Sequence, residues 1–81
     1  MFGTKKRTFK ELQLLILRTL SKKNATIYQI AKKNKLHFHV VQHQLILLKG
    51  QDLVSLAFEH GKFRLFSITD QGRKYLKKLK R

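Results

Sequence analysis

The sequence contains no cysteine and only four acidic residues, and both shortages restrict the chemistry available to the chain. Without cysteine, neither a disulfide bond nor a thiolate metal site can form. Four acids and four histidines are a thin supply for an active site, and the sequence shows no carboxylate pair, no Ser-His-Asp set and no phosphate-binding glycine loop. We therefore expect a protein that is not an enzyme and that needs no metal, no cofactor and no small-molecule ligand.

Long hydrophobic runs are missing as well. The best candidate, residues 12–20, is too short to span a bilayer and is interrupted by Gln13, Arg18 and Thr19. The first ten residues are basic, but no apolar segment of the kind found in signal peptides follows them. These absences predict a chain without a signal peptide or a membrane span, located in the cytoplasm and associated with the nucleoid.

The charge of the chain is strongly one-sided. Its 81 residues include 19 lysines and arginines, which gives a formal net charge of +15. A field of this size attracts polyanions, and a strongly basic domain is typical of nucleic-acid-binding proteins. An anionic membrane or an acidic protein would also attract such a charge, and charge by itself keeps a protein soluble. Because acidic residues would serve solubility equally well and self-repulsion destabilises a fold, we favour nucleic acid as the partner.

The length allows one domain, and a hydrophobic content of 42% predicts that it folds. We expect a basic flexible arm over residues 1–7 and a single domain over residues 8–81. Thr8 and Glu11 have the spacing of a capping box in front of a first helix. The residues at helical spacing that should form its inward stripe are Phe9, Leu12, Leu15, Ile16, Thr19 and Leu20.

Two further helices are expected in the first half of the chain. Thr26 is a suitable cap for a short second helix. A turn at Asn34 and Lys35 should follow it, because asparagine tolerates a left-handed backbone. A third helix is predicted over residues 37–49, and Gly50 should end it. Its inward stripe consists of Val41, Leu45 and Leu48.

After the third helix the hydrophobic period changes from helical to alternating. Residues 53–58 and 63–68 are rich in β-forming residues, and the short loop between them contains a glycine, which predicts a hairpin. Thr69 is a suitable cap for a last helix. The predicted order is therefore α-α-α-β-β-α, and the fold class is α+β, with a three-helix core, a two-stranded hairpin and a C-terminal helix.

The second and third predicted helices and the segments beside them carry a set of residues whose order and spacing are typical of one protein family. These residues are Thr26, Ile30, Ala31, Leu36, Val41, Leu45, Leu48, Leu53 and Val54. Residues 66–72, FSITDQG, follow the pattern aromatic-x-aliphatic-Thr-x-x-Gly. Together these features resemble the winged helix-turn-helix family, most closely small archaeal winged-helix regulators and chromatin proteins, and more distantly the MarR and ArsR repressors. That family usually has glycine where this chain has Asp52, and we expect Gly50 to take over the turn.

The resemblance implies that helix 37–49 is a recognition helix in the DNA major groove and that residues 59–64 form a wing on the minor groove or the backbone. The candidate base-reading residues are His37, His39, Gln42 and His43. Gln42 has the amide that pairs with adenine, whereas Phe38 is expected to pack. The candidate contacts to phosphate and the wing contacts are Thr26, Tyr28, Lys32, Lys33, Lys35, His60, Lys62 and Arg64.

A homodimer is expected as well, because a two-fold dimer would present two recognition helices to a palindromic site. Leu14 and Leu17 fall outside the inward stripe of the first helix and have no obvious use in a monomer. The proposed seam joins them to one side of the last helix and consists of Leu14, Leu17, Tyr75, Leu76 and Leu79.

Several alternatives stay open beside our interpretation, which is a transcriptional regulator that reads a specific sequence in double-stranded DNA. The protein would otherwise coat DNA with little regard to sequence, as chromatin proteins do, or dock as a winged-helix module on a protein or RNA complex. His39 and His43 have a metal-pair spacing, but no carboxylate nearby completes a site. Protonation of the histidines would alternatively strengthen DNA binding in acid.

Overall fold

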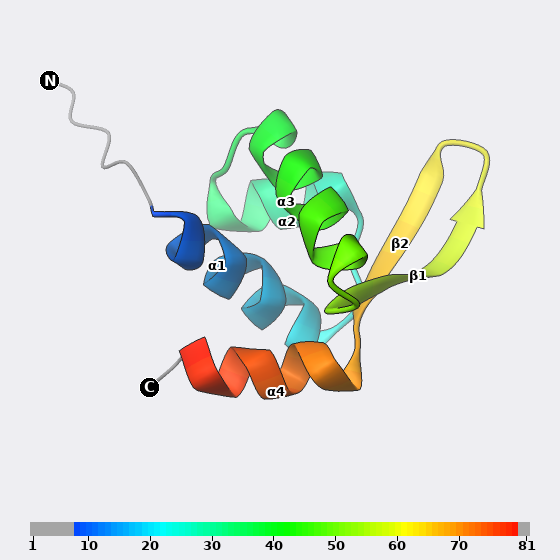
Figure 1. Cartoon of the computed structure of the whole chain (residues 1–81). Coiled ribbons are helices and arrows are strands. Elements are labelled where there is room, and N and C mark those ends of the chain that lie inside the picture. Colours follow the sequence, from blue (N-terminus) through cyan, green and yellow to red (C-terminus); the bar gives the residue numbers. More distant parts are fainter. Residues whose placement is uncertain (1–7, 80–81) are drawn as a thin grey trace, which may run out of the picture.

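The computed structural model describes residues 8–79 of the chain, so the expected basic arm over residues 1–7 lies outside the described residues. Three helices come first, followed by a hairpin and a fourth helix (Figure 1). Their bounds are α1 Phe9–Lys22, α2 Ile27–Asn34, α3 Phe38–Gly50, β1 Val54–His60, β2 Phe63–Ile68 and α4 Asp70–Leu79. The predicted order and the α+β class are confirmed.

Side-chain caps set where the helices begin. The Thr8 hydroxyl accepts from the Glu11 amide at 3.1 Å, while the Glu11 carboxylate accepts from the Thr8 amide at 2.8 Å. Thr26 and Gln29 form the same reciprocal box in front of α2, at 3.2 and 2.9 Å. Each box satisfies two amides that have no partner within the helix, which is why both helices start where the sequence predicts.

In two turns the left-handed residue lies one or two positions after the expected one. Lys35, not Asn34, takes the left-handed conformation that ends α2, with φ 54° and ψ 44°. The side-chain amide of Asn34 instead donates to the Thr19 hydroxyl and to the Ile30 carbonyl, both at 2.9 Å. These two hydrogen bonds hold Asn34 in the helix. After α3, Asp52 itself has φ 61°, and Gly50 remains helical. The expectation that Gly50 would replace the family's glycine is therefore wrong.

The turn at Asp52 is tied to the start of α4. The Thr69 hydroxyl donates to the Asp52 carbonyl at 2.6 Å and accepts from the Gly72 amide at 2.9 Å. In addition, the Thr69 amide donates to the Leu53 carbonyl at 3.1 Å. One threonine therefore caps α4, as predicted, and also joins the two ends of the hairpin.

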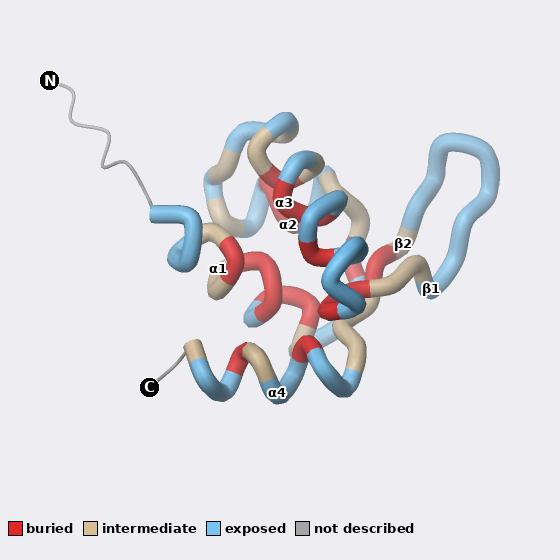
Figure 2. The backbone as a smooth tube through the Cα atoms, viewed as in Figure 1, coloured by how far each residue is buried: buried red, intermediate tan, exposed pale blue. Residues whose placement is uncertain are grey.

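The core lies between α1 and the elements that surround it (Figure 2). Helix α1 contacts α2, α3, α4 and β2, so it is buried on more than the single predicted stripe. Leu17, which we expected to face outward, is 0% exposed, whereas Phe9 from the predicted inward stripe is 53% exposed. The buried residues of α1 are Gln13, Ile16, Leu17, Thr19 and Leu20.

Strands β1 and β2 form an antiparallel hairpin with Gly61 at its turn, in a left-handed conformation (φ 59°). The register runs from Val54 opposite Ile68 to His60 opposite Phe63, with a bulge between Leu56 and Phe58. The edge of β2 that does not pair with β1 is also hydrogen-bonded near the base of the hairpin. There Ala25 and Phe66 exchange two backbone hydrogen bonds of 3.1 and 2.8 Å. The base of the hairpin is thus fixed to the α1–α2 connection, while its tip is exposed (Figure 2).

None of the helices in the described part of the chain is long and apolar enough to cross a membrane.

Candidate functional site

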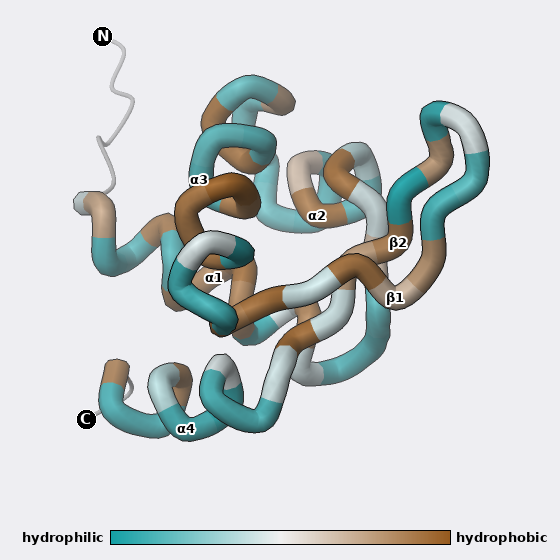
Figure 3. The backbone as a smooth tube through the Cα atoms, turned by 45° about the vertical axis from the view of Figure 1, so that its right-hand side comes forward, coloured by the Kyte–Doolittle hydropathy of each residue, from teal (hydrophilic) through white to brown (hydrophobic). Residues whose placement is uncertain are grey.

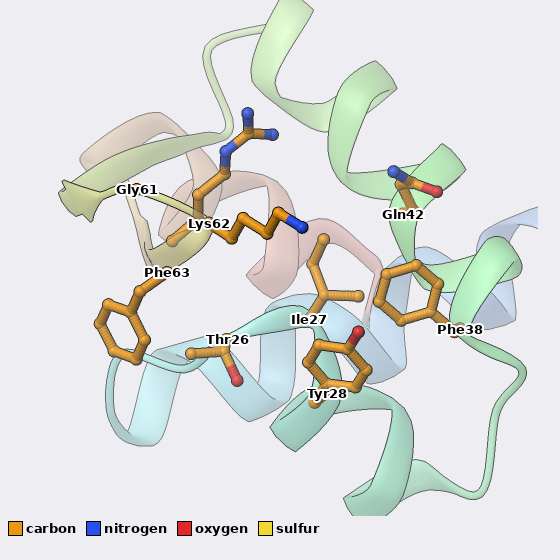
Figure 4. Close-up of a pocket in the computed structure, with 9 residues that line it drawn as sticks. Thr26, Ile27, Tyr28, Phe38, Gln42, Gly61, Lys62 and Phe63 are labelled. Atoms are coloured by element: carbon orange, nitrogen blue, oxygen red, sulfur yellow. The ribbon is translucent and has the colours of Figure 1, made fainter.

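A groove of about 540 Å³ lies between the start of α2, the outer side of α3 and the hairpin (Figure 4). Its lining consists of Thr26, Ile27, Tyr28, Phe38, Gln42, Gly61, Lys62, Phe63 and Arg64. A smaller hollow of about 110 Å³ continues it along α3 and shares Ile27, Gln42 and Arg64. The groove brings together residues of the second helix, third helix and hairpin that the sequence analysis selected separately.

One wall of the groove is aromatic. The rings of Tyr28 and Phe38 lie side by side, with centroids 4.8 Å apart (Figure 4). Tyr28 is 73% exposed, so its ring and hydroxyl are open to a partner. Phe38 supports the Tyr28 ring, as expected for a packing residue.

The opposite wall is cationic. Lys62 extends from the hairpin across the groove toward Ile27 and Phe38, whereas the Phe63 ring points away from them (Figure 4). Arg64 Nε donates to Glu59 Oε2 at 3.2 Å, and this ion pair is about half exposed on both sides. Water screens such a pair, so it orients Arg64 more than it stabilises the fold. His60 is exposed near the hairpin turn, outside the set of residues that line the groove.

The outer side of α3 carries a stripe of exposed residues opposite the core. His39, His43 and Ile46 recur at helical spacing and are exposed, while Gln42 is half-buried on the side that faces the hairpin. Gln44, on the core side of the same helix, is buried. This arrangement makes α3 a protruding helix with a mixed polar and apolar outer face.

Comparison with known proteins identifies the family of this chain. The family model for winged helix-turn-helix proteins matches residues 6–81. The chain belongs to the winged helix-turn-helix family. The predicted resemblance to the winged helix-turn-helix family is therefore confirmed, and in this fold α3 has the position of the recognition helix and the hairpin that of the wing. None of the curated proteins matches the sequence.

Several solved structures have the same fold. NMB1585, a MarR family regulator from Neisseria meningitidis, is 26% identical with a TM-score of 0.75, and the match covers 85% of this chain and 51% of that chain. Wild-type ZitR from Lactococcus lactis in complex with DNA is 24% identical with a TM-score of 0.75, over 95% and 53%. The protein smu.1704 from Streptococcus mutans is 24% identical with a TM-score of 0.82, over 96% and 80%. This winged helix spans about half the length of the first two proteins.

The lysines of α2 lie at the other end of that helix from the groove. Lys32 and Lys33 are exposed in its last turn, and Lys35 is exposed at its C-terminal cap. Thr26 and Tyr28 are at its start, beside the groove. An eight-residue helix is about 12 Å long, so the predicted phosphate contacts from α2 and its two ends form two separate groups.

His37 lies at the start of α3, beside its exposed outer face. It caps the recognition helix, and its Nδ1 accepts from the His39 amide at 3.3 Å. The His37 and His39 rings are stacked with centroids 5.3 Å apart. Within residues 8–79, no three His, Cys, Asp or Glu side chains come together in a group that would hold a metal ion.

The residues proposed for a dimer seam are largely used within one chain. Leu17 and Leu76 are buried in the core, and the packing of α4 on α1 accounts for this. Leu14, Tyr75 and Leu79 are partly buried against the same core, and the Tyr75 hydroxyl donates to Gln13 Oε1 at 3.1 Å. The prediction that Leu17 is an outward residue is therefore wrong.

Sequence reasoning missed the residues that connect the recognition helix with the wing. Ile27 lies between the two walls of the groove, and Ile46 and Lys49 line its continuation. Helical spacing from Val41, Leu45 and Leu48 is enough to place Ile46 on the outer face, but an isolated exposed isoleucine has no distinctive signal in a sequence.

Proposed function

We propose that this winged helix is a transcriptional regulator that binds a specific sequence in double-stranded DNA. Its recognition helix enters the major groove, and its wing contacts the adjacent minor groove or backbone. The observation that carries the proposal is the position of the groove between these two elements, with one aromatic wall and one cationic wall. A DNA strand that runs between a filled major groove and a wing would lie in this space.

The charges around the groove support a polyanionic partner. Lys62 and Arg64 come from the wing, and Thr26 presents a helix start whose backbone amides favour phosphate. Lys32, Lys33 and Lys35 extend the positive surface to the far end of α2. Phosphate contacts of this kind supply affinity but little sequence information, so they set the register of the recognition helix.

Specificity is assigned to the exposed stripe of α3 and to Gln42, which lies beside it on the side of the hairpin. Gln42 offers the amide that can pair bidentately with adenine, and His39 and His43 can donate to guanine or contact phosphate. His37 is proposed as a minor contributor, because its ring already caps the helix.

The solved structures with this fold support the same proposal. ZitR has this fold in complex with DNA, and NMB1585 is described as a MarR family regulator. By this analogy we propose a protein without catalytic activity that binds its site as a homodimer. The seam would use Leu14, Tyr75 and Leu79, since Leu17 and Leu76 are committed to the core.

Selection from a pool of random duplexes, followed by fluorescence anisotropy over a range of salt concentrations, tests the proposal. We expect a palindromic motif bound more than about 10³-fold tighter than random DNA. Its half-sites should be about 34 Å apart if two recognition helices read successive turns of the major groove. Gln42→Ala with His43→Ala should relax the selected motif and leave the affinity for random DNA nearly unchanged.

One observation favours a second function, in which the protein coats DNA without regard to sequence. The exposed side of α4 carries Arg73, Lys74, Lys77 and Lys78, so positive charge is not confined to α2 and the wing. If no motif emerges and the affinity only falls steeply with salt, the coating function replaces the regulator.

A further inference from the structure

The outer face of the recognition helix carries an exposed apolar side chain in its C-terminal half. Ile46 is a large aliphatic residue, yet it is 64% exposed. It is seven residues after His39 and three after His43, so the three side chains lie on one stripe. The core residues Val41, Leu45 and Leu48 occupy the opposite side of the helix.

Packing within the domain does not account for Ile46. The side chain borders the small hollow between α3 and the wing, where Gln42, Lys49 and Arg64 are its polar neighbours. Most of its surface still faces outward. A β-branched residue also forms helix less readily than leucine or lysine, so helix propensity gives no reason for isoleucine at this exposed position.

Major-groove chemistry offers one apolar feature on the base edges, the C5-methyl group of thymine. We propose that Ile46 is a specificity-determining residue that packs against a thymine C5-methyl group. This inference rests on the proposed function, and it names one further residue that determines specificity and the base that this residue recognises.

The position of Gln42 sharpens the proposal. Gln42 precedes Ile46 by four residues, about one helical turn or 6 Å along the axis. Its amide pairs with adenine, and Ile46 contacts a thymine methyl. The two side chains should therefore read an adenine and a thymine in adjacent or next-adjacent base pairs of each half-site.

Replacement of thymine by deoxyuridine removes the methyl group and retains base pairing, which makes it a direct probe. Each thymine of the selected motif is replaced in turn, symmetrically in both half-sites, and binding is measured by anisotropy. We expect one thymine position at which wild-type affinity falls about threefold to fivefold per half-site, the size of effect that corresponds to one buried methyl-sized group. Ile46→Ala should bind the thymine and deoxyuridine sites equally, and Ile46→Val should retain part of the difference.

Leu47 provides the matched control. It is also an exposed aliphatic residue of α3, at 36% exposure, but it lies about 100° further round the helix. Leu47→Ala should keep the wild-type ratio between the thymine and deoxyuridine sites. Circular dichroism of the three variants checks that the helices are unchanged, since the ratio has meaning only for a folded domain.

The outcomes separate the two levels of the argument. A motif that shows no sensitivity to deoxyuridine at any position overturns the role of Ile46 and leaves the regulator standing. A sensitivity that persists in Ile46→Ala assigns the methyl contact to another residue and also overturns the inference. If no motif is selected at all, the proposed function fails, and this inference fails with it.

Discussion

Gly72 lies in the first turn of α4, where the backbone of Leu53 leaves no room for a side chain. A Cβ atom at this position would meet the Leu53 carbonyl oxygen and would approach Ile68 Cγ1 to 2.7 Å. Backbone atoms cannot move aside as a flexible side chain can, so Gly72→Ala should force α4 away from the base of the wing. We expect the free energy of unfolding to fall by about 1–3 kcal/mol, measured by urea denaturation.

Gly50 is the control for this substitution, because a Cβ atom there meets no described atom within 4 Å. Gly50 is the last residue of α3, and alanine is the better helix former. Gly50→Ala should therefore leave the stability unchanged or raise it by up to about 1 kcal/mol. Equal destabilisation by both substitutions would contradict the steric explanation.

Single residues also show where sequence reasoning reaches its limit. The capping roles of Thr8, Thr26 and Thr69 were predictable, because a cap depends on a few neighbouring residues. The burial of Leu17 was not, because it depends on α4, which returns to α1 from the far end of the chain. The Gln13 amide oxygen has its partner, Tyr75, in that distant helix for the same reason.

The turn between α2 and α3 is the element in which stability and binding can be separated. Lys35 adopts a left-handed conformation, which costs a residue with a Cβ about 1–2 kcal/mol relative to the ordinary helical region. Lys35→Gly should relieve this cost and raise the free energy of unfolding by up to about 1 kcal/mol, after the greater chain entropy of glycine is deducted. If Lys35 contacts phosphate, the same substitution should weaken DNA binding and reduce the slope of log K against log salt by about 0.9.

Lys33→Gly removes the same charge two residues earlier, at an ordinary helical position. It should lower the stability by about 1 kcal/mol and weaken DNA binding to a similar degree. Urea denaturation and salt-dependent anisotropy distinguish the two variants. A loss of stability in both would show that the conformation of Lys35 is not strained.

Among the elements, those with a clear local period or cap were predicted well. The order of helices and strands followed from helical and alternating spacing, and the hairpin from a glycine between two β-rich runs. The backbone pairing of Ala25 with Phe66 and the bulge in β1 have no such local cause. They arise when the wing is fitted onto the α1–α2 connection, and the groove itself exists only once three separate elements are in place.

At the scale of the whole molecule, positive charge is present on two distant surfaces. Helix α2 and the wing carry one group of cations, and α4 carries another. Helix α4 is predominantly hydrophilic and packs against α1, on the side of the molecule away from α2 and the wing tip (Figures 1 and 3). A duplex held by the recognition helix and the wing would therefore not reach the exposed lysines of α4.

Two pairs of substitutions with the same change in net charge test whether one surface or the whole molecule binds DNA. Lys32→Gln with Lys33→Gln changes α2, and Lys77→Gln with Lys78→Gln changes α4; each pair removes two of the +15 charges. Each lost phosphate contact should reduce the salt slope by about 0.9. For a regulator that binds through one face, the substitutions in α2 should reduce the salt slope measured by anisotropy. The substitutions in α4 should leave the slope almost unchanged, because solvent ions screen charges beyond about 10 Å at 0.1 M salt. Equal reductions from both pairs would mean that DNA contacts both surfaces, as expected of a protein that coats DNA.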